Sequence, residues 1–138
     1  MASWRLAKSL EELRRQVNTK WPKRSRTHDG SIGDAKHASR HSDHNPHVRD
    51  GRVGVVTAID ITHDTLYGPT ISRLAEALRA SRDHRIKYLI CNGKICSYVK
   101  DPWRWRKYTG SNPHDKHLHV SVRGLKGLYD NTQPWIIT

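Results

Sequence analysis

Near its C-terminal end the chain reads Pro113-His114-Asp115-Lys116-His117-Leu118-His119-Val120-Ser121-Val122. From residue 117 onward apolar and polar side chains alternate, and a period of two is typical of a β-strand that buries one face. Because residues i and i+2 of a strand share a face, His117 and His119 are predicted to point the same way. Two imidazoles on one sheet face form half of a metal site.

Asp60 lies in a second predicted strand, over residues 55–61. It alternates with Ile59 and Ile61, so its carboxylate is expected to face away from their apolar side. A charge in a strand requires a partner, because burying it alone is very costly. The partner is either a divalent metal or one of the 25 lysine and arginine side chains, and the histidine pair downstream favours the metal.

Histidine is frequent and clustered: the chain has ten, and nine lie in residues 28–63 or 114–119. Two dense zones indicate one site assembled from distant segments. His44, in the turn-rich Ser42-Asp43-His44-Asn45-Pro46, is the first candidate for a third ligand. The rival candidates in this zone are His41, His37 and His47.

Length and hydropathy predict one domain over residues 1–138 with a small core, since only 35% of the residues are hydrophobic and the mean hydropathy is −0.83. No apolar run approaches the roughly 20 residues of a membrane-spanning helix, so no membrane insertion is expected. The N-terminus lacks the apolar core of a signal peptide, which predicts synthesis in a cytoplasm. Nothing in the sequence predicts an oligomer, and a monomer is expected.

The net charge of +12 favours polyanionic partners. Nucleic acid and the anionic polymers of bacterial cell walls are equally attractive partners on charge alone.

The predicted fold class is α+β, a small antiparallel sheet that carries Asp60 and His119 and is flanked by two helices. The helices are expected over residues 7–19, with Ser9 as N-cap, and over residues 70–81. A hairpin, residues 86–90 and 95–99, surrounds the turn Asn92-Gly93. Residues 22–54 are expected to be mostly loop with one helical turn near 33–39, and the tail 124–138 to be irregular.

Two pairs of residues allow more than one interpretation. Cys91 and Cys96 flank the hairpin turn and are either a disulfide or metal-ligand pair, or two small apolar residues, and the lack of other cysteines favours the latter. Trp103 and Trp105, interleaved with arginines, either stack on bases or sugars or pack into the core from a strand. Trp105 is kept as a candidate substrate contact at the edge of a cleft.

Several of these segments resemble the zinc peptidases of bacterial peptidoglycan. The family comprises D-alanyl-D-alanine carboxypeptidases and phage L-alanyl-D-glutamate endopeptidases, with the hedgehog/DD-peptidase fold, and is related to murein endopeptidases that carry a His-x-His motif. The matching segments are Ser42-Asp43-His44, Ala58-Ile59-Asp60 and His117-Leu118-His119, and Asp29-Gly30-Ser31-Ile32-Gly33-Asp34 is similar to small lysis proteins of actinobacteriophages. The resemblance covers roughly residues 30–123 and implies that His44, Asp60 and His119 bind Zn²⁺.

The chain departs from the family pattern in two places. His44 and Asp60 are 16 positions apart, whereas the family usually has seven, so the loop 46–54 is expected to bulge out. Lys116 occupies the position where the carboxypeptidases place a catalytic acid three residues before the last ligand. The order His114-x-x-His117-x-His119 is closer to the murein endopeptidases.

The resemblance implies a hydrolase in which two imidazoles and one carboxylate leave one zinc position open for water. His117 is expected to be the general base, with His114 as the second choice, and Asp115 is expected to orient one of these imidazoles. Arg40 is a candidate for holding a substrate carboxylate or the oxyanion. The implied partner is peptidoglycan, reached after release by a holin-type protein, since no signal peptide is visible.

Two other classes of function stay open at this point. One is a basic nucleic-acid-binding protein or metal-dependent nuclease, although no known DNA- or RNA-binding motif is present. The other is an inactive relative that binds the cell wall without cutting it, which Lys116 leaves open.

Overall fold

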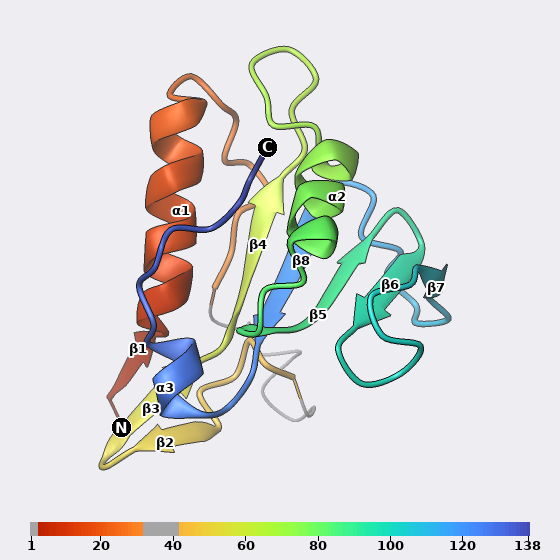
Figure 1. The fold of residues 1–138 in the computed structure, drawn as a ribbon. Helices are drawn as coiled ribbons and strands as arrows, with labels where there is room; N and C mark the ends of the chain where they lie inside the picture. The colour runs from red at the N-terminus through yellow and green to blue at the C-terminus, as the bar shows by residue number, and fades with distance from the viewer. Residues whose placement is uncertain (1–2, 32–41) are drawn as a thin grey trace.

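A computed structural model of the 138-residue chain describes residues 3–31 and 42–138 (Figure 1). The helical turn expected near 33–39 lies outside these ranges. The elements are β1 (Trp4–Leu6), α1 (Lys8–Lys20), β2 (Val48–Asp50), β3 (Val53–Val56), β4 (Ala58–Thr62), α2 (Ile71–Ser81), β5 (Ile86–Cys91), β6 (Lys94–Ser97), β7 (Arg106–Lys107), β8 (His117–Val122) and α3 (Lys126–Tyr129).

The α+β class is confirmed, and the described residues form two sheets. A mixed sheet has the strand order β1-β3-β2, and an antiparallel sheet has the order β4-β8-β5-β6-β7. Figure 1 shows β4 and β8 at the centre, with α1 and α2 alongside. Within the second sheet Asp60 lies directly opposite His119, so the predicted sheet with both residues is present.

One face of the antiparallel sheet is covered by the two longer helices. The apolar residues of α1 (Leu10, Leu13, Val17) and α2 (Ile71, Leu74, Ala75, Leu78) are buried in one cluster with the alternate residues of β4, β5 and β8. Because side chains of a strand alternate between faces, the residues between them point to the opposite face. Asp60 and His119 are on that second face, away from the core.

The predicted strand 55–61 is two strands that belong to different sheets. The change occurs at Thr57, whose N–H bonds to the Asp43 carbonyl at 3.1 Å and whose carbonyl accepts the N–H of Val122. The chain leaves the first sheet here and joins β8. Periodicity alone could not show this break, because the apolar pattern continues through it.

Three further expectations were wrong. Residues 103–105 are not a strand, because Trp103 has a positive φ of 63° and only Arg106–Lys107 pairs with β6. The N-cap of α1 is Ala7, and Ser9 is buried inside the first turn. The tail, expected to be irregular, contains α3, whereas the described part of residues 22–54 is mostly loop as expected, interrupted by β2 and the start of β3.

The two cysteines are free and buried, which confirms their interpretation as apolar hairpin residues. No helix in the described ranges combines the length and apolar character that a membrane span needs.

Candidate metal centre

The segment that carries His44 is attached to the sheet next to β4. The Asp43 carbonyl accepts the Thr57 N–H, and Pro46 lies against Gly54. A Cβ at position 54 would come within 2.6 Å of the Pro46 carbonyl oxygen, so glycine is required for this close approach. These contacts bring His44 to the face of the sheet on which Asp60 and His119 project.

Three side-chain atoms from these distant segments meet at nearly equal distances. His44 Nε2 lies 3.1 Å from His119 Nδ1 and 3.2 Å from Asp60 Oδ1, and His119 Nδ1 lies 3.3 Å from the same oxygen. Zinc bonds of 2.0–2.1 Å in a tetrahedral shell place ligand atoms about 3.3 Å apart. The spacing and the donor set therefore suit a zinc ion, and these three residues could hold a metal.

The outer nitrogen of His44 is fixed by the backbone. Its Nδ1 lies 2.7 Å from the Ser31 carbonyl, which can only accept a hydrogen bond. Nδ1 therefore carries the proton in the neutral ring, and Nε2 presents its lone pair to Asp60 and His119.

His119 is held by a chain of side chains on the same face. Its Nε2 lies 2.7 Å from Ser121 Oγ, and Tyr88 stacks on its ring with centroids 5.2 Å apart and an interplanar angle of 7°. Ser121 and Asp43 lie close enough to the Tyr88 hydroxyl to shift its pKa. Asp43 in turn is buried and paired with Lys87 at 3.0 Å.

Ser121 can fix the tautomer of His119. Burial and the charge of Asp43 raise the pKa of Tyr88 to about 12, so the Tyr88 hydroxyl stays protonated beside these side chains. When Ser121 Oγ accepts the proton of His119 Nε2, the His119 Nδ1 lone pair faces Asp60. Imidazoles oriented in this way are typical metal ligands.

Three electron-rich atoms at such distances repel one another unless a cation lies among them. Burial opposes ionisation of Asp60, yet His119 and His44 outweigh it and hold the Asp60 pKa well below its usual range. Burial opposes protonation of His44 too, but Asp60 raises its pKa overall. The cluster is thus ready to receive a cation, which can be a metal ion or a proton.

His117 and His114 lie beside the three candidate ligands. His117 Nε2 is 3.6 Å from Asp60 Oδ2, the oxygen that does not face His44. The His114 ring centroid is 4.9 Å from that of His117 and 5.6 Å from that of His119. His114 Nδ1 donates to the Asn112 carbonyl at 2.7 Å, which leaves its Nε2 as an acceptor.

Both neighbouring imidazoles are neutral at neutral pH. Burial and the nearby His119 and His117 lower the pKa of His114 to about 4. Burial also lowers the pKa of His117, although Asp60 partly offsets the effect. Each ring therefore has an unprotonated nitrogen that can accept a hydrogen bond.

The other predicted site residues lie elsewhere. Asp115 is exposed and, within the described ranges, contacts none of these imidazoles; Ser31, Ser121 and Asn112 orient His44, His119 and His114 instead. Trp105 donates its indole N–H to Glu76 and borders a hollow of about 120 Å³ beside α2, with no candidate ligand in its wall. Arg40, His37 and His41 lie outside the described residues.

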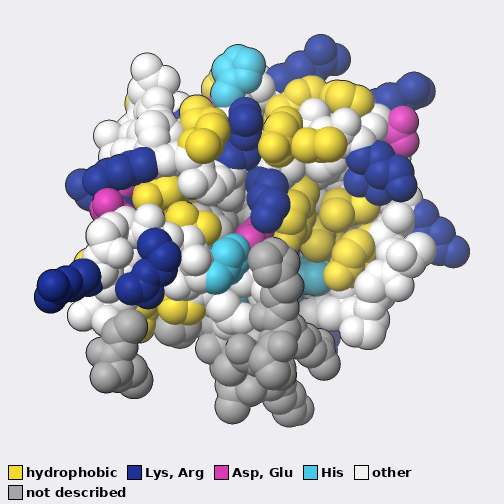
Figure 2. Space-filling view, turned by 90° about the horizontal axis from the view of Figure 1, so that it is seen from below, with side chains coloured by type: hydrophobic (Ala, Val, Ile, Leu, Met, Phe, Trp, Pro, Cys, Tyr) yellow, Lys and Arg dark blue, Asp and Glu magenta, His cyan; other side chains and the backbone are white. Residues whose placement is uncertain are grey.

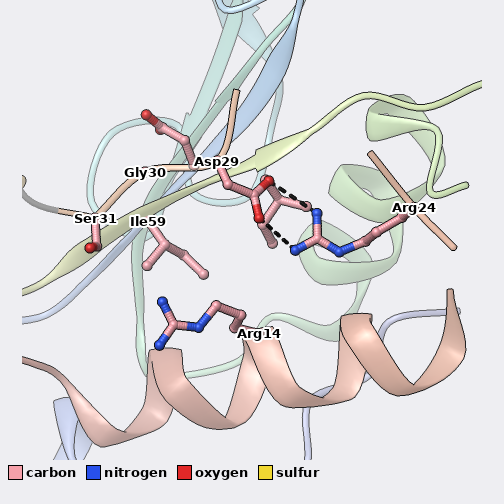
Figure 3. A pocket seen from close by; sticks show the side chains of 8 residues that line it. Arg14, Arg24, Asp29, Gly30, Ser31 and Ile59 are labelled. Carbon is pink, nitrogen blue, oxygen red and sulfur yellow. Dashed lines mark hydrogen bonds and ion pairs between the residues drawn. The ribbon is translucent and has the colours of Figure 1, made fainter. Parts of the chain in front are cut away.

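Sequence reasoning missed a group of contacts next to β4 that holds the segment around Asp29 in place. Figure 3 shows Arg24 paired with Asp29 through two contacts, and Arg14 of α1 extending toward Ile59 along a pocket of about 180 Å³. Asp29 also accepts the N–H and the hydroxyl of Thr62, and Gly30 pairs with Asp60. This support fixes Ser31, and through it His44.

Ser121 could have been found from the sequence, since it follows His119 by two positions on one strand and therefore shares its face. Tyr88, Asp43 and Ser31 could not, because the strand order and contacts between distant segments bring them to the site. Figure 2 shows histidine and acidic side chains next to one another near the centre of one face, with Lys and Arg side chains close by. No protein-family model, no curated protein and no solved structure matches this chain.

Proposed function

We propose that this protein is a zinc-dependent peptidase that cleaves peptide bonds of bacterial peptidoglycan. The observation that carries the proposal is the triangle of His44 Nε2, Asp60 Oδ1 and His119 Nδ1, with sides of 3.1 to 3.3 Å, next to two neutral imidazoles. Zinc peptidases combine this type of ligand set with a neighbouring proton acceptor. The resemblance of the motifs to peptidoglycan peptidases is the reason for proposing peptidoglycan as the substrate.

Zn²⁺ held by these three residues would lower the pKa of a bound water to about 7 and polarise the substrate carbonyl. Asp60 supplies the negative charge of the ligand set, and its low pKa keeps it ionised throughout the neutral range. The Ser31 carbonyl and the Ser121 hydroxyl hold the protons of His44 and His119 on the outer nitrogens.

The proton transfers fall to His117. Its Nε2 faces the free oxygen of Asp60, and its lowered pKa leaves the ring unprotonated and able to take the water proton. Protonated His117 is then stabilised by Asp60 and can deliver the proton to the leaving amine. His114, with a pKa of about 4, is a poor base at neutral pH and is better suited to accept a hydrogen bond from the substrate.

The net charge of +12 would attract the protein to anionic wall polymers. We propose that it acts as a monomer on the wall after a holin-type protein releases it from the host cytoplasm. The two rival functions, nucleic-acid binding and non-catalytic wall binding, are outcomes that the following test separates.

The test measures bound metal and the release of new amino termini from purified peptidoglycan, with and without a chelator. We expect one zinc per chain and chelator-sensitive release in the parent, and loss of both in His119→Ala. His84→Ala, which removes an exposed histidine elsewhere, should retain both. Zinc without cleavage would indicate a binding protein, and absence of zinc would contradict the ligand assignment and favour a nucleic-acid partner.

A further inference from the structure

One row of paired residues crosses the whole antiparallel sheet. Asp60 lies opposite His119, His119 opposite Ile90, Ile90 opposite Ile95, and Ile95 opposite Arg106. Directly paired residues of neighbouring strands project from the same face of a sheet. Arg106 is therefore on the face of the candidate metal centre, at the opposite edge.

The two isoleucines make the middle of this row apolar. Ile90 and Ile95 are buried and half-buried, yet neither belongs to the core cluster on the helix side of the sheet. Figure 2 shows histidine, hydrophobic and basic side chains close together on one face of the molecule. An apolar strip between a metal centre and a cation suits a peptide with an apolar part and a negative group.

Arg106 has a hydrogen-bond donor without a partner among the described residues. Its Nε is buried and has no hydrogen-bond partner within the described residues. Of the other buried or half-buried arginines, Arg123 lies over the Tyr98 ring, and four pair with a carboxylate, namely Arg5, Arg24, Arg79 and Arg85. An unpaired guanidinium donor is costly, and Arg106 is only half-buried, so its guanidinium is suited to pair with a group outside the chain.

The position of Arg106 limits where that group lies on a substrate. Neighbouring strands are about 4.8 Å apart, so three strand spacings place Arg106 about 14 Å from His119. An extended peptide covers that distance in about four residues. A guanidinium binds a carboxylate through two parallel hydrogen bonds, the strongest pairing available to it.

We propose that Arg106 binds a free carboxylate of the substrate, located within about four residues of the bond that is cut. The inference rests on the proposed peptidase function and makes the substrate an acidic stem peptide, with a free rather than amidated carboxyl group. Arg106 would determine which peptide binds and in which register, while the row from Ile95 to His119 places the scissile bond at the metal centre.

The experiment uses three synthetic peptides with the zinc-loaded full-length protein. They are the pentapeptide L-Ala-γ-D-Glu-L-Lys-D-Ala-D-Ala, the same peptide amidated at the α-carboxyl of D-Glu, and the same peptide with a C-terminal amide. Each is tested with the parent, Arg106→Gln, Arg106→Lys and the matched control Arg104→Gln, which removes a neighbouring exposed charge.

Arg106→Gln is expected to raise KM for the unmodified peptide roughly 10- to 100-fold at unchanged kcat, the usual effect of losing a charged hydrogen-bonded pair. Amidation of the recognised carboxyl should raise the KM of the parent by a similar factor and have little further effect on Arg106→Gln. Arg106→Lys should recover part of the loss, and Arg104→Gln should behave like the parent.

Equal effects of Arg106→Gln on all three peptides would overturn the inference, as would independent effects of the substitution and of both amidations. If the zinc-loaded parent cuts none of the peptides, the proposed function fails, and calorimetric binding decides the role of Arg106. The inference would then be supported if Arg106→Gln and amidation of the recognised carboxyl each raise Kd and their combination raises it little further. Equal or undetectable binding of all three peptides would overturn it.

Discussion

His44 Nε2 and His119 Nδ1 lie 3.1 Å apart, although 75 positions separate the two residues in the chain. Neither nitrogen is the one that the surroundings protonate, since Ser31 and Ser121 hold the outer nitrogens. Two lone pairs at this distance are stable only with a cation between them or with one ring protonated. The consequences for metal binding, stability and pH can each be measured.

The side chains of Tyr88 and Ser121 should control zinc affinity. Tyr88→Phe removes the hydroxyl that lies beside Ser121 and Asp43, and Ser121→Ala removes the hydroxyl that lies 2.7 Å from His119 Nε2. Each substitution is expected to weaken zinc binding about 10- to 100-fold, the usual effect of losing an orienting partner. Competition with a chromophoric chelator measures the affinity.

Tyr98→Phe is the matched control, because Tyr98 contacts Arg123 and not the candidate ligands. Unchanged zinc affinity in both Tyr88→Phe and Ser121→Ala would show that His119 is oriented by packing alone.

Zinc should stabilise the folded chain, because the three ligands come together only when β4, β8 and the His44 segment are in place. Zinc at a thousand times its Kd is expected to add about 4 kcal/mol to the free energy of unfolding and to raise the Tm. Asp60→Asn should abolish most of this increase, since it removes the anionic ligand. A zinc-induced increase in Tm of equal size in Asp60→Asn would place the metal elsewhere.

The sequence predicts the helices and the two site strands well because each has a local signal. The apolar spacing of Leu10, Leu13 and Val17 marks α1, and the alternation after His117 marks β8. The same alternation places His117 and His119 on one side. Local patterns of this kind are reliable because the apolar face of each element packs against the core.

The remaining features depend on contacts between distant segments. Thr57 divides a continuous apolar run between two sheets because Asp43 accepts its N–H, and no local residue pattern marks this break. The row that ends at Arg106 requires the strand order β4-β8-β5-β6-β7, which periodicity does not provide. For the same reason Trp105, predicted at the cleft, is on the α2 side bonded to Glu76.

Gly54 should be necessary for the position of His44. In Gly54→Ala the new Cβ would meet the Pro46 carbonyl oxygen at 2.6 Å and Pro46 Cβ at 2.7 Å, so the segment 42–47 must shift. We expect a loss of about 1–3 kcal/mol in the free energy of unfolding, typical of overpacking, together with weaker zinc binding. Urea unfolding and chelator competition measure the two effects.

Gly127→Ala is the control for Gly54→Ala, because a Cβ at position 127 meets nothing within 4 Å. A Gly54→Ala protein with the stability and zinc affinity of the parent would show that the Pro46 contact does not position His44.

The pair of Arg24 and Asp29 predicts how stability changes in acid. The Arg24 side chain is fully buried, and its loss of a partner in Asp29→Asn should cost about 3–5 kcal/mol at neutral pH. Burial opposes ionisation of Asp29, but Arg24 and Thr62 outweigh it and lower the Asp29 pKa below its ordinary 3.8. A lowered pKa in the folded state means that the stabilisation is complete above the unfolded pKa and disappears as the pH falls through the folded one.

The difference between parent and Asp29→Asn, measured by urea unfolding of the zinc-free proteins, should therefore be constant near neutrality and shrink below about pH 4. Asp115→Asn, which alters an exposed carboxylate, should match the parent at every pH. If the parent and Asp29→Asn differed by the same amount at all pH values, the stabilisation would come from packing and not from the charge of Asp29.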